Sequence, residues 1–579
     1  MKHFKQSLFL FILIALSFNS LAMNMLDELE YYIEKYKLAD SSNELVRRVD
    51  NVFKKVRRVA DKNHKRPPHL AIIKGFNTKN DPLAMALPDG GIVLSKHAIE
   101  VFYKNVSLAD GDIRAAFVLG HELAHLAKDD FSHREFLHIN SPLLSGLITT
   151  YRKQDGKQKE IEADAYGFRY AAMAGYRVDK LLAKNKTNQD FFLYWQEQNF
   201  QAVNDSHPNA ATRAEHLQMR LRKLLDSVRY FHFGVRLSHF QRCDDAVYFF
   251  REFMNQFSGH QVYNNLGVCE LQKARIFLGD DAYLYWFPSV LDVTVPTDKF
   301  SLPYNYKGER NTLADESLKK AKEFFELAFK MDNNYVPAKI NLAITTFYLE
   351  EYYEARAAIE KAHELAPNDL DIEAMRAVII YEQGKQMPYV DMWPRVIHLL
   401  DNLMEKSNLP PSVLYNTAKL LDARKRTGAE KIWQQLAQRL TELPEPIRKT
   451  VCKNTTCTTQ QRQKSEIAKW NLPVKFGVKA RRDKTLRKWQ KGKRRLYKIN
   501  ERIYREPNDA AEVLALRGRV EMVVLKQLNN IRQKDLAAYC VQALREREVL
   551  NGKLWSCTNW AALVVDDEVK EVWVVKDKR

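Results

Sequence analysis

A 34-residue period in the middle of the chain is the feature that most limits what this protein can fold into. Small residues recur at this spacing, for example Ala321 and Ala355. Such positions let the two helices of a hairpin touch, and the period is typical of tetratricopeptide-like helix pairs. It predicts an α-solenoid whose clearest repeat is 336–369, with weaker copies at 240–273 and 411–440. Helical hairpins without a binding role are the alternative interpretation.

The repeat array is only part of a long chain. Its 579 residues are too many for one hydrophobic core, so several domains are expected. A hydrophobic content of 45% with 28% charged residues is typical of a folded soluble protein. Residues 276–312 interrupt the array with aromatic residues and three prolines, which predicts a long loop.

The first 22 residues predict export from the cytoplasm. Lys2 and Lys5 precede an apolar run from residue 8 to residue 18, and Ser20 and Ala22 supply the small residues of a cleavage site. This run is too short for a stable membrane span. We therefore expect a secreted mature chain that begins after Ala22.

Six cysteines occur in the chain, an even number that suits disulfides in an oxidising compartment. Two pairs are close in sequence, and a third would join two helices of the repeats. For this third pair, buried free thiols are the alternative. The three pairs are Cys452 with Cys457, Cys540 with Cys557, and Cys243 with Cys269.

A nearly all-round apolar helix is predicted at residues 110–130, and it carries the sequence HELAH. His121 and His125 lie four residues apart and therefore share one helix face. Two imidazoles in this arrangement suit two ligands of a tetrahedral zinc ion. Glu122 is rotated off that face, where it can act as general base on a water molecule. The alternative is a buried helix whose histidines only satisfy polar neighbours.

A second helix, predicted at residues 159–170, offers a third ligand. Glu160 and Asp164 share a face of this helix, and alanines beside them indicate close helix packing. Glu160 can complete a His, His, Glu set, while Asp164 can accept the free ring N–H of a ligand histidine. Glu162 points elsewhere. A solvated acidic face is the usual interpretation of paired carboxylates alone.

Four motifs occur in a fixed order: NDPLAMALPDGGIVLS, HELAH, EIEAD and SHPNAATRAEHL. In this order the chain resembles the gluzincin family that includes the CAAX prenyl endopeptidases, the HtpX membrane peptidases and the soluble BepA periplasmic peptidases. The resemblance covers about residues 25–220. Since the transmembrane helices of the membrane members are missing from the sequence, it points to the soluble periplasmic branch.

The resemblance implies roles for individual residues. It implies that one Zn²⁺ is bound by His121, His125 and Glu160, with Glu122 as base. It also implies that His207 and Arg213 lie by the metal, where they can stabilise an oxyanion. For His207 it implies a further role, since this histidine can occlude the zinc in a resting enzyme.

Residues 83–95 predict a β-hairpin, because two extended runs flank the turn sequence Pro88-Asp89-Gly90-Gly91. An edge strand beside the HELAH helix would let a peptide add as a further strand. An ordinary sheet strand is the alternative.

Positive charge is concentrated in residues 464–505, which contain 16 Lys and Arg but only 3 Asp and Glu. This segment therefore contributes +13 to the formal net charge of +19. Aromatic residues between these cations suit an anionic surface such as lipid or cell-wall polymer, and export disfavours nucleic acid. A solvated helix face is the alternative. Residues 561–565 and 568–575 predict a terminal hairpin.

Together these features predict a mainly α protein. The expected parts are a signal peptide at 1–22, a zincin-type α+β metallopeptidase domain at 23–225, tetratricopeptide-like repeats at 226–445 and a small basic α/β module at 446–579. The predicted function is a periplasmic zinc endopeptidase whose repeats dock unfolded or misassembled proteins or an envelope partner. The resemblance alone adds outer-membrane quality control. A chaperone-like scaffold with a latent zinc site is the alternative, and a binding protein for anionic polymers is a weaker third.

Overall fold

The structure is a computed structural model. Contacts between residues divide the chain into two units, Met1–Tyr230 with Met331–Asn333 and Phe231–Lys330 with Asn334–Arg579. The structure describes residues 28–61, 67–75, 83–128, 145–182, 190–191, 194–195, 210–292, 312–387, 389–457, 469–490 and 502–576, without 527, 529–530, 541–543 and 550–551. The predicted signal peptide lies outside these residues.

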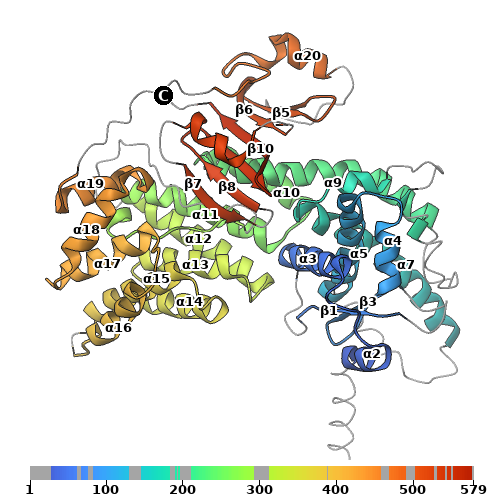
Figure 1. Ribbon diagram of the computed structural model, residues 1–579, viewed down its shortest axis with the longest axis horizontal. Coiled ribbons are helices and arrows are strands. Elements are labelled where there is room, and N and C mark those ends of the chain that lie inside the picture. Colours follow the sequence, from blue (N-terminus) through green and yellow to red (C-terminus); the bar gives the residue numbers. More distant parts are fainter. Residues whose placement is uncertain are drawn as a thin grey trace, which may run out of the picture. The chain divides into compact units, whose positions relative to one another are not determined.

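The first unit combines a small sheet with helices that pack around the HELAH segment (Figure 1). The chain order is α2, α3, β1, β2, β3, α4, α5 and α7, and α9 begins near its end. Their bounds are Glu28–Tyr36, Glu44–Val59, His69–Ile73, Ala84–Ala86, Gly91–Ser95, Lys96–Tyr103, Leu108–Lys128, Ser145–Met173 and Ala210–His239.

The predicted hairpin is confirmed. Strands β2 and β3 pair antiparallel with Ala86 opposite Ile92, and Gly90 takes a positive φ in the turn between them. Strand β1 pairs parallel with the other side of β3. Within the described residues β2 is therefore an edge strand of the order β1-β3-β2, and it contacts helix α5.

Two polar contacts fix the helices that surround α5. Arg48 on α3 binds the carboxylate of Asp112 on α5 through two nitrogens, each 2.7 Å from an oxygen. Such bidentate pairs add geometric specificity to the contact. Ser95 ends β3 and caps α4 by accepting a hydrogen bond from the Ala98 amide. The first contact joins α3 to α5, and the second sets where α4 begins.

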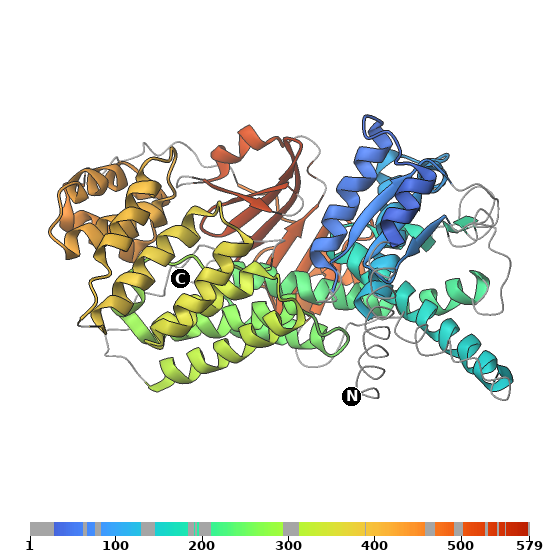
Figure 2. The ribbon, with the colours of Figure 1, turned by 90° about the horizontal axis from the view of Figure 1, so that it is seen from below.

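The second unit contains helices α10 to α19 in sequence (Figure 2), and most neighbours in the sequence pack on each other, for example α13 on α14 and α17 on α18. Helix pairs lie at each of the three positions that the 34-residue period predicts, which gives a mainly helical chain with an array of hairpins. The bounds are Cys243–Met254, His260–Leu278, Thr312–Met331, Val336–Tyr348, Tyr352–Leu365, Leu370–Lys385, Trp393–Met404, Pro411–Ala423, Ala429–Gln438 and Glu445–Asn454.

The predicted loop at 276–312 is confirmed only for residues 284–292, and residues 293–311 lie outside the described residues. Helix α11 continues to Leu278, a short 3-10 helix follows at Gly279–Tyr283, and residues 284–292 then form neither helix nor strand. This irregular segment is buried, since Tyr285, Trp286 and Phe287 belong to the core of the helical array. Burial of three aromatic side chains stabilises this position of the segment.

A seven-stranded antiparallel sheet ends the chain, larger than the small α/β module that we predict. Its order is β4-β5-β6-β10-β9-β8-β7. The predicted terminal hairpin is confirmed as β9 and β10, with Val565 opposite Glu568. The bounds of β4 to β10 are Arg502–Arg505, Ala511–Leu516, Arg519–Leu525, Arg545–Val549, Gly552–Ser556, Trp560–Val565 and Glu568–Val575.

In the basic stretch, the described aromatic residues serve packing. Trp470 stacks on Tyr539 with ring centroids 4.0 Å apart, and both Trp470 and Trp489 pack against the core of the sheet. Helix α20 covers Lys484–Gln490. Tyr497 lies outside the described residues. The predicted anionic partner of residues 464–505 stays a prediction.

Two of the three predicted cysteine pairs are confirmed as disulfides, Cys452–Cys457 and Cys540–Cys557. The third prediction is wrong, since Cys243 and Cys269 are free thiols. The Ser238 hydroxyl lies 3.7 Å from the Cys243 Sγ and 3.5 Å from the Cys269 Sγ, and the Cys243 thiol donates to Gln272 at 2.8 Å. Hydrogen bonds thus satisfy the Cys243 thiol without a covalent link.

Replacing Cys540 and Cys557 by serine is expected to loosen the terminal sheet. The disulfide closes a loop of 17 residues, and the loss of this constraint costs about 3 kcal/mol by loop entropy. Amides of β9 should then exchange with solvent roughly 100-fold faster. Mass-detected hydrogen exchange measures this. The Cys452→Ser, Cys457→Ser protein is the matched control, and equal exchange of β9 in both variants would contradict the prediction.

None of the helices among the described residues is both long enough and apolar enough to cross a membrane.

Candidate metal centre

Helix α5 brings two imidazoles together at its buried C-terminal half. His121 and His125 are one turn apart, and their Nε2 atoms lie 3.1 Å from each other. The rings meet edge to face with centroids 4.7 Å apart. His121 is only 8% exposed. Both nitrogens point to one place on the helix surface, as the spacing of four residues predicts.

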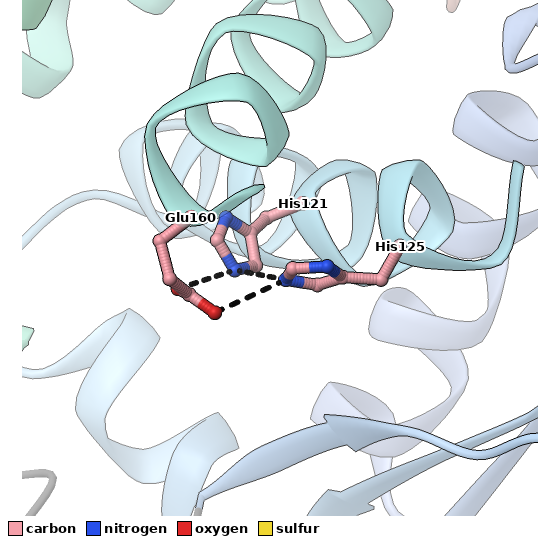
Figure 3. Close-up of side chains that lie close together, drawn as sticks. All are labelled: His121, His125 and Glu160. Carbon is pink, nitrogen blue, oxygen red and sulfur yellow. Dashed lines mark hydrogen bonds and ion pairs between the residues drawn. The ribbon is translucent and has the colours of Figure 1, made fainter. Parts of the chain in front are cut away.

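Helix α7 adds a carboxylate at the same place. Glu160 Oε2 lies 3.4 Å from the Nε2 of His121, and Glu160 Oε1 lies 3.4 Å from the Nε2 of His125 (Figure 3). The three side chains thus offer three ligand atoms, all within 4.8 Å of one another. The predicted third ligand therefore meets the two histidines.

The separations can be tested against the geometry of zinc. A tetrahedral zinc ion bonded at about 2.0–2.1 Å places its ligand atoms roughly 3.3 Å apart. The Nε2–Nε2 distance of 3.1 Å is close to one edge of such a tetrahedron, and each Nε2 lies 3.4 Å from a different oxygen of the Glu160 carboxylate. Two imidazoles and one carboxylate are also a donor set that zinc takes in proteins. The residues present therefore fit a zinc ion by their chemistry and by the proximity of their ligand atoms.

Asp164 contacts His121 at Nδ1, the ring nitrogen that faces away from the site. Its Oδ1 lies 3.0 Å from the Nδ1 of His121, and the residue is 1% exposed. A hydrogen bond from Nδ1–H to this carboxylate leaves the Nε2 lone pair directed at the site. The predicted partnership between Asp164 and a ligand histidine is therefore present.

The electrostatics of the site favour a cation. Burial lowers the pKa of His121, but the carboxylates of Asp164 and Glu160 outweigh burial and raise the pKa to about 10. Without a metal ion the two carboxylates thus favour the protonated ring, and a metal that binds Nε2 would replace the proton there. A metal ion bound at His121 and Glu160 would also offset the negative charge of the two carboxylates.

Two glycines let the helices approach, and sequence reasoning missed their role. A Cβ on Gly120 would lie 2.9 Å from the backbone oxygen of Gly167. A Cβ on Gly167 would lie 2.8 Å from the amide nitrogen of His121. Helices α5 and α7 therefore touch backbone to backbone beside the histidine. The signal was a glycine within each predicted helix, since glycine in a helix interior often marks close packing.

The remaining predicted residues are placed less completely. Glu122 follows His121 on α5 and is 8% exposed. Arg213 lies within helix α9, but its side chain is outside the described part of the structure. His207 lies outside the described residues altogether. The proposed positions of His207 and Arg213 beside the metal therefore stay predictions.

Comparisons with known proteins give no family assignment. No family model matches the chain, and no curated protein matches it. Among solved structures, a monomeric mutant of IFIT1 with Gppp-AAAA is 12% identical over 75% of this chain and 98% of that chain, with a TM-score of 0.27. The human IFIT1 dimer with m7Gppp-AAAA is 11% identical over 72% of this chain and 98% of that chain, with a TM-score of 0.23. Scores this low do not establish a shared fold.

Proposed function

We propose that this protein is a zinc-dependent endopeptidase of the periplasm, acting on unfolded or misassembled envelope proteins. One observation carries the proposal. The Nε2 atoms of His121 and His125 lie 3.1 Å apart, each lies 3.4 Å from one carboxylate oxygen of Glu160, and the Asp164 carboxylate contacts the other ring nitrogen of His121. Two disulfides fit the proposed oxidising compartment.

Each residue of the proposed site would have its own role in peptide hydrolysis. A zinc ion held here would act as a Lewis acid on the scissile carbonyl and lower the pKa of an attacking water. Glu122, next to the first ligand, would take the proton of that water and pass it to the leaving amine. Asp164 keeps the ring of His121 in the orientation and tautomer that a ligand needs. His207 or Arg213 would offset charge that develops on the oxyanion.

Strand β2 is the proposed binding edge for the substrate main chain. It is the outer strand of the described sheet, and it contacts the helix that carries both histidines. A peptide added to this edge would be held by main-chain hydrogen bonds, which carry little sequence preference. Such binding suits substrates that are recognised because they are unfolded.

Zinc content measured beside two matched variants tests the proposal. We expect about one zinc per chain in the parent, loss of most of it in Glu160→Gln, and full retention in Glu162→Gln. Glutamine keeps the size of glutamate, and Glu162 is an exposed residue of the same helix. Atomic absorption after dialysis measures the metal. Equal zinc content in the two variants would show that Glu160 is not a ligand. No zinc in the parent would contradict the whole metal site.

A chelator should abolish casein cleavage by the parent, and added zinc should restore it. The reason is that the Lewis acid is lost with the metal while the protein residues remain. Cleavage that persists in metal-free protein would contradict zinc catalysis.

A further inference from the structure

Residues 285–292 lie among the helical repeats in the manner of a bound ligand. Tyr285, Trp286, Phe287 and Leu291 are 4%, 7%, 2% and 0% exposed, although the segment contains no helix or strand. Because the segment forms no regular secondary structure, its main-chain N–H and C=O groups need hydrogen-bond partners from the surrounding helices. The helices supply those partners.

Two buried asparagines each bind both main-chain groups of one residue. The Asn416 side chain on α17 accepts from the Trp286 amide at 2.8 Å and donates to the Trp286 carbonyl at 2.9 Å. The Asn341 side chain on α13 accepts from the Val290 amide at 2.8 Å and donates to the Val290 carbonyl at 2.6 Å. The same bidentate contact thus occurs twice, on two different helices.

Helix α11 continues the series. Asn264 donates to the Val290 carbonyl at 3.0 Å, and Asn265 accepts from the Asp292 amide at 2.8 Å. The residues held by asparagine are therefore 286, 290 and 292, all an even number of positions apart. This parity is that of an extended chain, in which alternate residues face the same side.

The burial of these asparagines suits side chains that bind the main chain of another segment. Asn264, Asn341 and Asn416 are 0%, 0% and 2% exposed. A buried amide without hydrogen-bond partners costs stability, so these side chains require a polar occupant. Every residue except proline offers the N–H and C=O pair that each asparagine binds, so the contacts do not depend on the sequence of the occupant.

We propose that helices α11, α13 and α17 form a binding groove for extended, unfolded polypeptide, and that residues 285–292 are a displaceable internal occupant of it. The preferred client is an extended segment with consecutive large apolar residues, because Tyr285, Trp286 and Phe287 fill the groove now. Such segments are exposed in unfolded proteins and buried in folded ones. The inference deepens the docking role proposed for the repeats and rests on that part of the proposal, but it does not require an active zinc site.

A substitution in the occupant tests displacement without touching the groove. Val290→Pro removes the N–H that Asn341 accepts, while proline and the residue before it remain compatible with an extended chain. Val290→Ala is the matched control, since it shortens the side chain and keeps the N–H. The probe is a fluorescent ten-residue peptide with the sequence of residues 283–292, and fluorescence anisotropy with the full chain measures its binding.

We expect Val290→Pro to bind the peptide at least roughly tenfold more tightly than the parent, and Val290→Ala to resemble the parent. Adding Asn416→Ala to Val290→Pro should lower the binding again, because a bidentate contact of the groove is lost. A well-folded Val290→Pro protein, by circular dichroism, that binds no better than the parent would overturn the proposal. So would binding that Asn416→Ala leaves unchanged.

A measurement on the unaltered protein covers the case in which Val290→Pro does not fold. Excess unlabelled peptide should speed hydrogen exchange at the amides of Trp286 and Val290 in the parent, because displaced residues lose their asparagine partners. Unchanged exchange at peptide concentrations that saturate a site would show residues 285–292 to be a permanent part of the core. Zinc content and casein cleavage are measured in the same samples, so failure of the groove and failure of the peptidase are told apart.

Discussion

Glu122→Gln is expected to lower casein cleavage by at least roughly 1,000-fold while about one zinc per chain remains. The substitution keeps the size of the side chain and removes the carboxylate that would take a proton from the attacking water. His121, His125 and Glu160 are unchanged, so metal binding should persist. Cleavage rates and zinc content, measured on the same preparations, separate these two effects.

Each outcome of this experiment has a distinct meaning. Cleavage by the parent alone, with zinc in both proteins, would support the peptidase. Zinc in both proteins with cleavage in neither would support the scaffold with a latent site, and His207→Ala should then release activity. Equal cleavage by parent and variant would remove Glu122 from the mechanism.

Gly167→Ala is expected to abolish most zinc binding although it adds a single methyl group. The new Cβ would lie 2.8 Å from the His121 amide nitrogen and 3.1 Å from the His121 Cα, so α5 and α7 must move apart. Because His121 and His125 lie on one helix and Glu160 on the other, this movement lengthens both contacts between the Glu160 carboxylate and the imidazoles. We expect zinc affinity to fall by roughly 100-fold, measured by competition with a chromogenic chelator.

Helix propensity predicts the opposite sign, which makes the result diagnostic. Alanine in place of a helix-interior glycine stabilises a helix by about 1 kcal/mol where space permits. Ala165→Gly, two residues away on α7, is the control. It should lower the melting temperature of the protein and leave zinc content near one per chain. Zinc binding in Gly167→Ala equal to that of the parent would show that the helices do not need this approach.

The sequence predicted the parts of the candidate site that local geometry determines. A spacing of four residues places His121 and His125 on one face of any helix, and the same spacing relates Glu160 to Asp164. The turn residues at 88–91 likewise predict the hairpin without knowledge of its surroundings.

What the sequence did not predict depends on contacts between distant residues. Gly120 and Gly167 are 47 positions apart in the sequence, and each glycine alone only lowers the helix propensity of its segment. Trp286 and Asn416 are 130 positions apart, so the sequence predicted a loop at this place but not its burial among the helices. Cys243 and Cys269 have a spacing that allows a bond, but the spacing does not specify where each thiol points.

The placement of the three donor atoms also has a mechanical consequence. His125 and Glu160 are 35 positions apart in the chain, so a metal held by both would act as a reversible cross-link that closes this loop. By the loop entropy that applies to disulfides, closure restricts the unfolded chain by about 4 kcal/mol. The stability of the first unit would then follow the free zinc concentration, since ligand binding stabilises the folded state by mass action. A compartment short of zinc would contain a protein that is both inactive and easier to unfold.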